Sequence, residues 1–255
     1  MVTTPKGTAL ITGAGKRIGR ALALGLAEHG FHIGVHYNSS AKDADAVVTE
    51  IEKHGLRAHA LQADLSDNSE TAGLMSAATS ALGPISLLIN CASIFENDTL
   101  NDFSNDSLHR HFNVNLFAPM ILAQGYAAQI DDNANNLIIN ITDQRVRKPT
   151  PQFFTYAASK SALSAATITM AQALAPRSIR VNAIAPGPTL KNARQSEADW
   201  EKQQAATVLG IGATPNDIVS GALYFLAARS VTGETIAIDG GQNLAWQTPD
   251  VMVNE

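Results

Sequence analysis

The chain has 255 residues, the length of one large domain, and 45% of them are hydrophobic while 16% are charged, which allows a sizeable core and argues against disorder. A formal net charge of -5 argues against nucleic acid or an acidic membrane as a partner, because both favour a basic surface. The single cysteine, Cys91, excludes an internal disulfide, and no Cys/His cluster has the spacing of a metal site. The sequence shows no signal peptide and no apolar run of ~20 residues, so we expect a soluble cytoplasmic protein with no metal site.

Short apolar runs alternate with longer helical patterns, which predicts an α/β fold with a doubly wound, seven-stranded parallel sheet and helices on both faces. The expected strands are Thr8–Thr12, His32–His36, Arg57–Gln62, Ile85–Asn90, Asn136–Ile141, Ile179–Ile184 and Thr235–Ile238. The expected helices are Arg20–His29, Ala41–His54, Ser69–Leu82, Ser104–Gln129, Thr155–Ala175, Glu197–Thr207 and Asn216–Ala228. No repeat, low-complexity run or linker divides the chain, so residues 1–255 are predicted to form a single domain.

Two of the helices carry further predictions. Pro119 lies inside Ser104–Gln129 and predicts a bend there. Thr155–Ala175 is apolar nearly all round, a pattern typical of a helix buried on both sides. The sheet would cover one side and a second subunit the other, which favours a homo-oligomer, although a cover from the same chain remains an alternative.

The turn after the first strand, T-G-A-G-K-R-I-G at Thr12–Gly19, has the strand–turn–helix context of a dinucleotide site. Gly13 and Gly15 would permit the tight turn and close approach of a pyrophosphate, and Gly19 close helix–strand packing, with the helix N-terminus facing the phosphates. The alternative is an ordinary βα turn that uses glycine for its geometry alone.

The end of the second strand, His36-Tyr37-Asn38-Ser39-Ser40, lacks the acid that usually binds the ribose of NAD. Arg17, in the first turn, is suited to a 2′-phosphate, so the sequence favours NADPH (NADP+); Arg17 as a solvated charge is the alternative. Asp64-Leu65 after the third strand would meet the adenine edge, or belong to the N-cap region of the next helix.

Tyr156 and Lys160 are four residues apart in a predicted helix and therefore share one face, with Asp143 thirteen positions before the tyrosine. A nearby ammonium favours phenolate, so we expect Lys160 to lower the pKa of Tyr156 towards the working range. The three residues are candidates for an acid–base site.

Together these motifs resemble the short-chain dehydrogenase/reductase family, which has a Rossmann-like fold, over essentially the whole chain. Besides the first turn and Asp64-Leu65, the resemblance rests on Asn90-Cys91-Ala92-Ser93, Asn115, the Tyr156/Lys160 pair, Pro186-Gly187 and Asp239-Gly240-Gly241. Arg17 in the first turn, Asp143 in place of the usual serine, and Ala92-Ser93-x-Phe95 after the fourth strand resemble the pteridine and dihydropterin (dihydromonapterin) reductases. Ile18, next to Arg17, would be a further cofactor contact. Ser39 departs from that subgroup, which often has arginine there, and weakens the preference for NADPH without reversing it.

The resemblance implies roles for several residues. Asp143, Tyr156 and Lys160 would form the catalytic set with Asn115, which would bind a water beside Lys160 or simply bend its helix. Phe95 would stack on a flat pterin, unless it is core, and Ser93 would contact ligand or phosphate. The remaining cofactor contacts would come from the end of the fourth strand and the loop after the sixth, namely Asn90, Ala92, Pro186, Gly187 and Thr189.

The replacement of serine by Asp143 also has a physical consequence. A serine hydroxyl can donate a hydrogen bond to a ketone, whereas a carboxylate only accepts and repels a developing alkoxide. Asp143 therefore favours a substrate with ring N–H donors or a proton relay through Tyr156. Two alternatives stay open: Asp143 is a turn residue with Thr142 supplying the hydroxyl, or Asp143 is protonated and serves a ketone.

The loops around these residues give weaker predictions. Arg145, Arg147 and Lys148 are expected to be solvated, although one could meet an anionic substrate tail. Residues 190–209 are expected to form a substrate lid, and Cys91 to be a small apolar residue beside the cofactor.

The sequence thus predicts an NADPH-dependent reductase that transfers hydride to a pterin-like heterocycle, in a homo-oligomer that we expect to be a homotetramer. The alternatives are a 3-oxoacyl-type or other ketone reductase and a non-catalytic cofactor-binding sensor.

Overall fold

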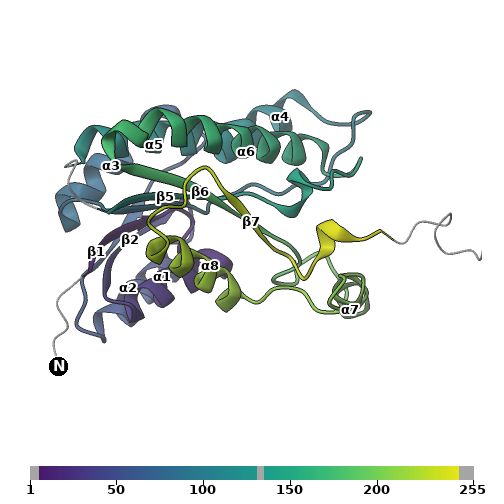
Figure 1. The fold of residues 1–255 in the computed structure, drawn as a ribbon, viewed down its shortest axis with the longest axis horizontal. Helices are drawn as coiled ribbons and strands as arrows, with labels where there is room; N and C mark the ends of the chain where they lie inside the picture. The colour runs from purple at the N-terminus through teal and green to yellow at the C-terminus, as the bar shows by residue number, and fades with distance from the viewer. Residues whose placement is uncertain (1–5, 131–134, 247–255) are drawn as a thin grey trace, which may run out of the picture.

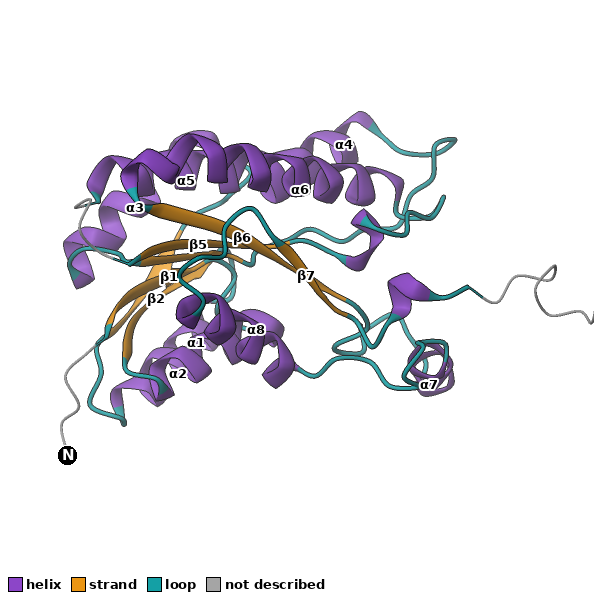
Figure 2. Ribbon diagram, viewed as in Figure 1, coloured by secondary structure: helices purple, strands orange, loops and turns teal. Residues whose placement is uncertain are grey.

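A parallel sheet of seven strands forms the centre of the computed structural model, which describes residues 6–130 and 135–246 (Figures 1 and 2). The strand order is β3-β2-β1-β4-β5-β6-β7, so the order reverses between β1 and β4. The strands are β1 Gly7–Ile11, β2 Phe31–Tyr37, β3 Ala58–Gln62, β4 Leu87–Asn90, β5 Asn136–Ile141, β6 Ile179–Pro186 and β7 Thr235–Ile238. The predicted doubly wound, seven-stranded sheet is confirmed.

Helices cover both faces of the sheet (Figure 1). One face carries α1 Arg17–Glu28, α2 Ala41–Glu52 and α8 Pro215–Ala227. The other carries α3 Asn68–Leu82, α4 Asn105–Phe112, α5 Ala118–Gln129 and α6 Phe154–Leu174, while α7, Glu197–Ala205, lies apart at one end. None of the described helices is long and apolar enough to cross a membrane.

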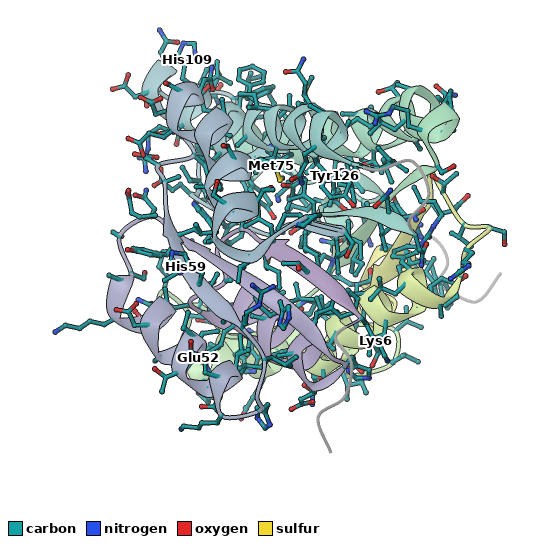
Figure 3. The ribbon with its side chains drawn as sticks, turned by 90° about the vertical axis from the view of Figure 1, so that its left-hand side faces the viewer. Lys6, Glu52, His59, Met75, His109 and Tyr126 are labelled. Carbon is teal, nitrogen blue, oxygen red and sulfur yellow. The ribbon has the colours of Figure 1, made fainter. Side chains whose placement is uncertain are left out.

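The central strands are apolar at almost every position because both faces of the sheet are buried. In β5, Leu137 and Ile139 pack into the cluster beneath α1 and α8, while Ile138 between them faces the α3 and α5 side. Tyr126 of α5 is fully buried there, and its hydroxyl donates to the Ser86 carbonyl at 2.6 Å. Tyr126 and Met75 lie in the interior of the molecule, whereas Lys6 and Glu52 lie at its periphery (Figure 3).

The predicted ends of most elements differ from the structure by one to three residues, as helix ends commonly do. The largest difference is at α1, which begins at Arg17 and not at Arg20. The strands Asn136–Ile141 and Thr235–Ile238 have the predicted bounds.

The predicted helix Ser104–Gln129 is interrupted, and the single bent helix expected there is wrong in detail. α4 ends at Phe112, a π-helical segment spans Asn113–Phe117, and α5 begins at Ala118. Pro119 has no N–H, so the Asn115 carbonyl cannot receive its usual α-helical bond, and the Ala118 N–H reaches back five residues to Asn113. The irregularity in the helix therefore lies about one turn before Pro119, where we expected the bend.

Candidate active site

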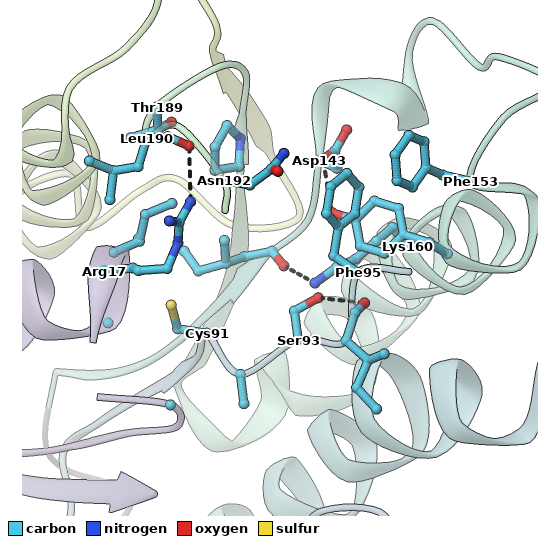
Figure 4. A pocket seen from close by; sticks show the side chains of 18 of the residues that line it. Arg17, Cys91, Ser93, Phe95, Asp143, Phe153, Lys160, Thr189, Leu190 and Asn192 are labelled. Carbon is cyan, nitrogen blue, oxygen red and sulfur yellow. Dashed lines mark hydrogen bonds between the residues drawn. The ribbon is translucent and has the colours of Figure 1, made fainter. Parts of the chain in front are cut away.

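A cavity of about 1130 Å³ opens at the carboxyl ends of the strands, where the strand order reverses (Figure 4). Its wall comes from the first βα turn, the ends of β2 and β3, the loops after β4, β5 and β6, α6 and the predicted lid segment 190–209. Such a switch point is where ligands bind in open α/β sheets.

The first turn is packed too closely for side chains at two of its glycines. A Cβ on Gly19 would lie 2.1 Å from the Gly13 carbonyl oxygen, and one on Gly13 would lie 3.0 Å from the Ala92 Cα. Thr12 ties the turn to the loop after β4, because its Oγ1 accepts the Cys91 and Ala92 N–H groups at 2.9 and 3.0 Å. The turn and that loop thus form one wall.

His36 supports the turn from the end of β2. Its Nδ1 accepts the Gly13 N–H at 3.0 Å, so Nε2 carries the proton and donates to the Ala63 carbonyl at 3.1 Å. Burial lowers the pKa of His36 to about 4, which keeps the ring neutral. Of the predicted run from His36 to Ser40, His36 and Asn38 line the cavity, whereas Tyr37, Ser39 and Ser40 are not part of its wall.

Asp64 and Leu65 both line the cavity, and Asp64 also belongs to the N-cap region of α3, because its N–H donates to Glu70 Oε2 in the first turn at 2.7 Å. The Asp64 carboxylate accepts the Ser66 N–H and hydroxyl at 2.9 and 2.7 Å, which lower its pKa. Asp67 is the residue that caps α3, accepting the Ser69 N–H at 2.7 Å.

Arg17 connects the first turn to the predicted lid segment. It adopts a left-handed conformation with φ of 52°, and its guanidinium donates to the Leu190 and Lys191 carbonyls at 2.9 Å each (Figure 4). Ile18 and Gly19 also line the cavity, whereas Gly15 packs against α2, where a Cβ would lie 3.3 Å from the Ala44 nitrogen.

Tyr156, Lys160 and Asp143 meet at the cavity wall, with Tyr156 and Lys160 on one face of their helix as the spacing predicted. The Tyr156 hydroxyl donates to Asp143 Oδ2 at 2.8 Å, and Lys160 Nζ donates to the Ile141 carbonyl at 2.7 Å. The ammonium lies 5.9 Å from the centre of the Tyr156 ring. α6 positions the tyrosine and the lysine, and the end of β5 positions the aspartate.

The pKa of Tyr156 shifts in the direction opposite to our expectation. Burial raises this pKa well above its usual value, and the Asp143 carboxylate raises it further. The pKa of Lys160 is shifted instead, because burial lowers it to about 8. Burial also raises the pKa of Cys91 to about 12, so the thiol is an apolar group on the cavity wall, in agreement with the sequence.

Asp143 is both a turn residue and a partner of the tyrosine. Its Oδ1 accepts the Arg145 N–H at 2.8 Å, and Oδ2 remains for Tyr156. The Thr142 hydroxyl is buried and donates to the Ile184 carbonyl at 3.0 Å, so it is not the hydroxyl of the site.

Of the three basic residues after Asp143, Arg147 is exposed as expected, whereas Arg145 and Lys148 are partly buried, which corrects the sequence interpretation for these two. Arg145 is partly buried and forms an ion pair with Asp143 at 3.3 Å. Arg147 donates to the Thr235 carbonyl, and Lys148 donates to the Ala245 carbonyl at 2.8 Å. Arg145 is thus the cation of the three that contacts Asp143, while Arg147 and Lys148 donate to backbone carbonyls elsewhere.

Phe95 is part of an aromatic group on the cavity wall and is not a core residue. Its ring stacks on Phe153 with centres 4.3 Å apart and planes at 3°, and it meets Tyr156 edge-on at 4.7 Å. Phe153 was missed in the sequence, although its place three residues before Tyr156 was the available signal.

Asn90 and Asn115 lie behind the cavity wall. Asn90 donates to Asn140 at 2.8 Å, whereas the Asn115 amide holds the loop after β4 by accepting the Ile94 N–H at 2.9 Å and donating to its carbonyl at 3.0 Å. Ser93, which lines the cavity, donates to the same Asn115 oxygen at 3.1 Å.

The loop after β6 and the predicted lid segment close the remaining side. Pro186, Gly187 and Thr189 line the cavity, and the Thr189 hydroxyl donates to the Gly187 carbonyl at 3.1 Å. The predicted lid segment adds several residues that sequence reasoning did not single out, since no motif marks them: Asn192, Arg194, Gln195, Trp200 and Gln203. No cluster of metal-binding type occurs in the described residues.

The N-terminus of α6 is capped from the loop after β4. Phe153 has a left-handed φ of 56°, and the next two N–H groups donate to Asp98, from Phe154 to its carbonyl at 3.2 Å and from Thr155 to its carboxylate at 3.0 Å. Asp98 is buried and also accepts the Ser107 hydroxyl at 3.2 Å. The cap fixes the turn that places Tyr156.

The sequence of the chain matches the family model for short chain dehydrogenases over residues 7–202. The chain belongs to the short-chain dehydrogenase family. Among curated proteins, this short-chain dehydrogenase is 31% identical to the 3-oxoacyl-(acyl-carrier-protein) reductase FabG of Staphylococcus aureus over 238 residues, which cover 92% of this chain and 97% of the relative.

Two solved structures are more similar. FolM alternative dihydrofolate reductase 1 from Brucella suis, in complex with NADP, is 44% identical, with 98% of each chain covered and a TM-score of 0.92. Its counterpart from Brucella canis, also complexed with NADP, is 43% identical, covers 97% of this chain and 98% of its own, and has a TM-score of 0.91.

Proposed function

We propose that this short-chain dehydrogenase is an NADPH-dependent reductase of a dihydropterin-type heterocycle. The observation that carries the proposal is the hydrogen bond of 2.8 Å from the Tyr156 hydroxyl to Asp143 Oδ2, in a position where the family usually has serine. The similarity to the two FolM structures, which contain NADP, supports both the cofactor and the substrate class.

The cavity fits the cofactor. Gly13 and Gly19 leave no room for side chains at the first turn, and Lys16 at the N-cap of α1 makes no side-chain bond to that helix, so the first N–H groups of α1 are free for a pyrophosphate. Asn38, with no acid next to it in the sequence, follows β2. Arg17 is the cation suited to a 2′-phosphate, and its guanidinium would turn from the Leu190 and Lys191 carbonyls to meet it. NADPH supplies a hydride when it is bound.

The side chains of the site divide the remaining work. The raised pKa keeps Tyr156 protonated, so its hydroxyl is the proton donor to the substrate. Lys160 places a positive charge beneath it, and its proposed role includes holding the nicotinamide ribose. Pro186, Gly187 and Thr189 would hold the nicotinamide end, and residues 190–209 would close over the substrate as a lid.

Asp143 selects the substrate class in this proposal. An ionised carboxylate accepts hydrogen bonds, so it suits the N–H and amino groups of an aminopyrimidinone ring and disfavours the alkoxide of a reduced ketone. Phe95 offers a flat ring on the cavity wall for stacking against such a heterocycle, in line with its parallel contact with Phe153.

A second candidate is a 3-oxoacyl or other ketone reductase, which the 31% identity with FabG favours. Purified protein would be assayed for NADPH oxidation with a dihydropterin and with a 3-oxoacyl thioester under identical conditions. Reduction of the dihydropterin, and its loss in Asp143→Asn and Tyr156→Phe, are expected. Reduction of the thioester but not of the dihydropterin would give the function to the second candidate.

We also propose that the protein is a homotetramer. Three large apolar side chains are exposed on the α5 and α6 side of the sheet: Phe117 of the π-helical segment at 39%, Met120 of α5 at 46% and Ile168 of α6 at 48%. Contact with other subunits would bury them. Light scattering of the purified protein tests the subunit number. A cytoplasmic location remains a prediction of the sequence.

A further inference from the structure

Arg145 lies two residues beyond Asp143, at the substrate end of the cavity. Its side chain is only 17% exposed, although arginine is usually solvated. Asp143 Oδ1 accepts both its main-chain N–H at 2.8 Å and a guanidinium N–H at 3.3 Å. Arg145 thus donates two hydrogen bonds to Oδ1 of Asp143, and Oδ2 accepts the hydrogen bond from Tyr156.

The same guanidinium touches the aromatic group of the cavity wall. Its central carbon lies 5.0 Å from the centre of the Phe153 ring and 5.6 Å from that of Phe95. Because the two rings are stacked on each other, the cation lies at the edge of the stack and contacts both rings. Arg145 therefore joins the carboxylate that meets the tyrosine to the ring proposed to stack on the substrate.

The position of Arg145 has a cost for folding. Its Nε is buried without a hydrogen-bond partner among the described residues. A buried donor without a partner destabilises the fold, so stability alone does not explain this placement. A role in the site accounts for it.

We propose that Arg145 is a positioning residue that sets substrate selectivity, by holding Asp143 as a charged acceptor directed at Tyr156 and so favouring ring-nitrogen substrates over ketones. The inference rests on the proposed function, which it deepens. Without the guanidinium, Asp143 Oδ1 keeps only the main-chain N–H of residue 145, so the carboxylate is held less firmly on Tyr156. A tyrosine hydroxyl that is released from Asp143 can donate its hydrogen bond to a ketone oxygen.

Several other groups surround the carboxylate. Tyr156 and Lys160 face it from α6, with the Cys91 thiol beyond the lysine, and the predicted lid segment brings Arg194 to 5.8 Å from the centre of the Phe95 ring. Among the described residues, Arg145 is the cation that forms an ion pair with Asp143, so Arg145 is the residue to substitute in the test.

The variants for the test are Arg145→Met and Arg145→Lys, with Arg147→Met as the matched control. Arg147 lies in the same loop, is exposed, and donates to a backbone carbonyl of β7 and not to Asp143. Thermal melting establishes that each variant is folded. Values of kcat and KM are then measured from acid to neutral pH with a dihydropterin and with a ketone.

In Arg145→Met we expect kcat/KM for the dihydropterin at neutral pH to fall about 10- to 100-fold through misplacement of the acid–base pair. The ratio of ketone to dihydropterin activity should rise, because the carboxylate is no longer held on Tyr156. Arg145→Lys should restore much of the dihydropterin activity, and Arg147→Met should match the wild type.

An unchanged dihydropterin profile in Arg145→Met, with activity lost in Asp143→Asn, would overturn the role of Arg145 and leave the proposed function standing. If the wild type reduces ketones and not dihydropterins, the proposed function fails, and the ketone profiles decide on Arg145. A changed kcat/KM for the ketone in Arg145→Met that Arg145→Lys restores would then support its hold on Asp143, and unchanged ketone kinetics would refute it.

Discussion

Replacement of Lys160 by methionine should abolish turnover and yet make the cofactor-free protein more stable at pH 7. Lys160 is 2% exposed, and its ammonium is buried with a single hydrogen bond, to the Ile141 carbonyl. Burial of the charge lowers the pKa of Lys160 from 10.5 to about 8, which means that the folded protein disfavours the ammonium. Methionine has a similar length and no charge to bury.

The size of the effect follows from the same numbers. A fall in pKa from 10.5 to about 8 corresponds to roughly 3 kcal/mol of unfavourable free energy when the lysine is charged, at about 1.4 kcal/mol per pH unit. Loss of the bond to Ile141 removes about 1 kcal/mol of stability. The net gain is about 2 kcal/mol, or roughly 4–8 °C in melting temperature for a chain of this size.

The pH dependence identifies the cause of the gain. Between pH 8 and 10.5 the folded protein binds fewer protons at Lys160 than the unfolded chain does, so wild-type stability rises with pH in that window. The advantage of Lys160→Met should therefore be full below pH 8 and fade towards pH 10.5. Melting curves without cofactor measure it, with Lys42→Met, at an exposed position of α2, as the control. A lower melting temperature for Lys160→Met at pH 7, or a difference that does not vary with pH, would refute the reasoning.

Two further substitutions test the frame of the site. Gly19→Ala should destabilise the fold by about 1–3 kcal/mol and weaken NADPH binding, because its Cβ would lie 2.1 Å from the Gly13 oxygen. The control is Gly73→Ala, on an open face of α3, which should be neutral or stabilising. Denaturant unfolding and cofactor titration separate these outcomes, and equal effects of the two would contradict the packing argument. Asp98→Ala should cost about 1–3 kcal/mol by leaving the Thr155 N–H without its acceptor, and it should lower kcat by loosening the start of α6; an unaltered unfolding midpoint would count against the cap.

The fold was largely predictable because its signals are local. A continuous apolar run marks a strand that is buried on both faces, and Asn136–Ile141, buried at every position, was predicted to the residue. The partly exposed edge strand Thr235–Ile238 was also predicted to the residue. The interrupted helix was not predicted, because the effect of Pro119 depends on which carbonyl loses its donor. A proline in the sequence signals an irregularity but does not say whether a bend or a π-helical segment results.

The candidate site was predictable where helical spacing brings residues together, as for Tyr156 and Lys160. It was not predictable where the environment decides the chemistry. Lys160 was expected to lower the pKa of Tyr156, but burial and the Asp143 carboxylate raise it. Arg145 looked like a solvated charge because no local pattern shows that two phenylalanine rings and a carboxylate enclose it.

The cap of α6 has a consequence for the order in which the molecule assembles. Asp98 and Thr155 are 57 residues apart in the chain, and the intervening residues include all of α5 and β5. The first turn of α6 therefore acquires its acceptors only after the loop behind β4 has docked, at the entropic cost of closing a long loop. The N–H groups of Phe154 and Thr155 should then exchange with solvent together with the loop that carries Phe95. The aromatic wall and the tyrosine form, and open, as one unit.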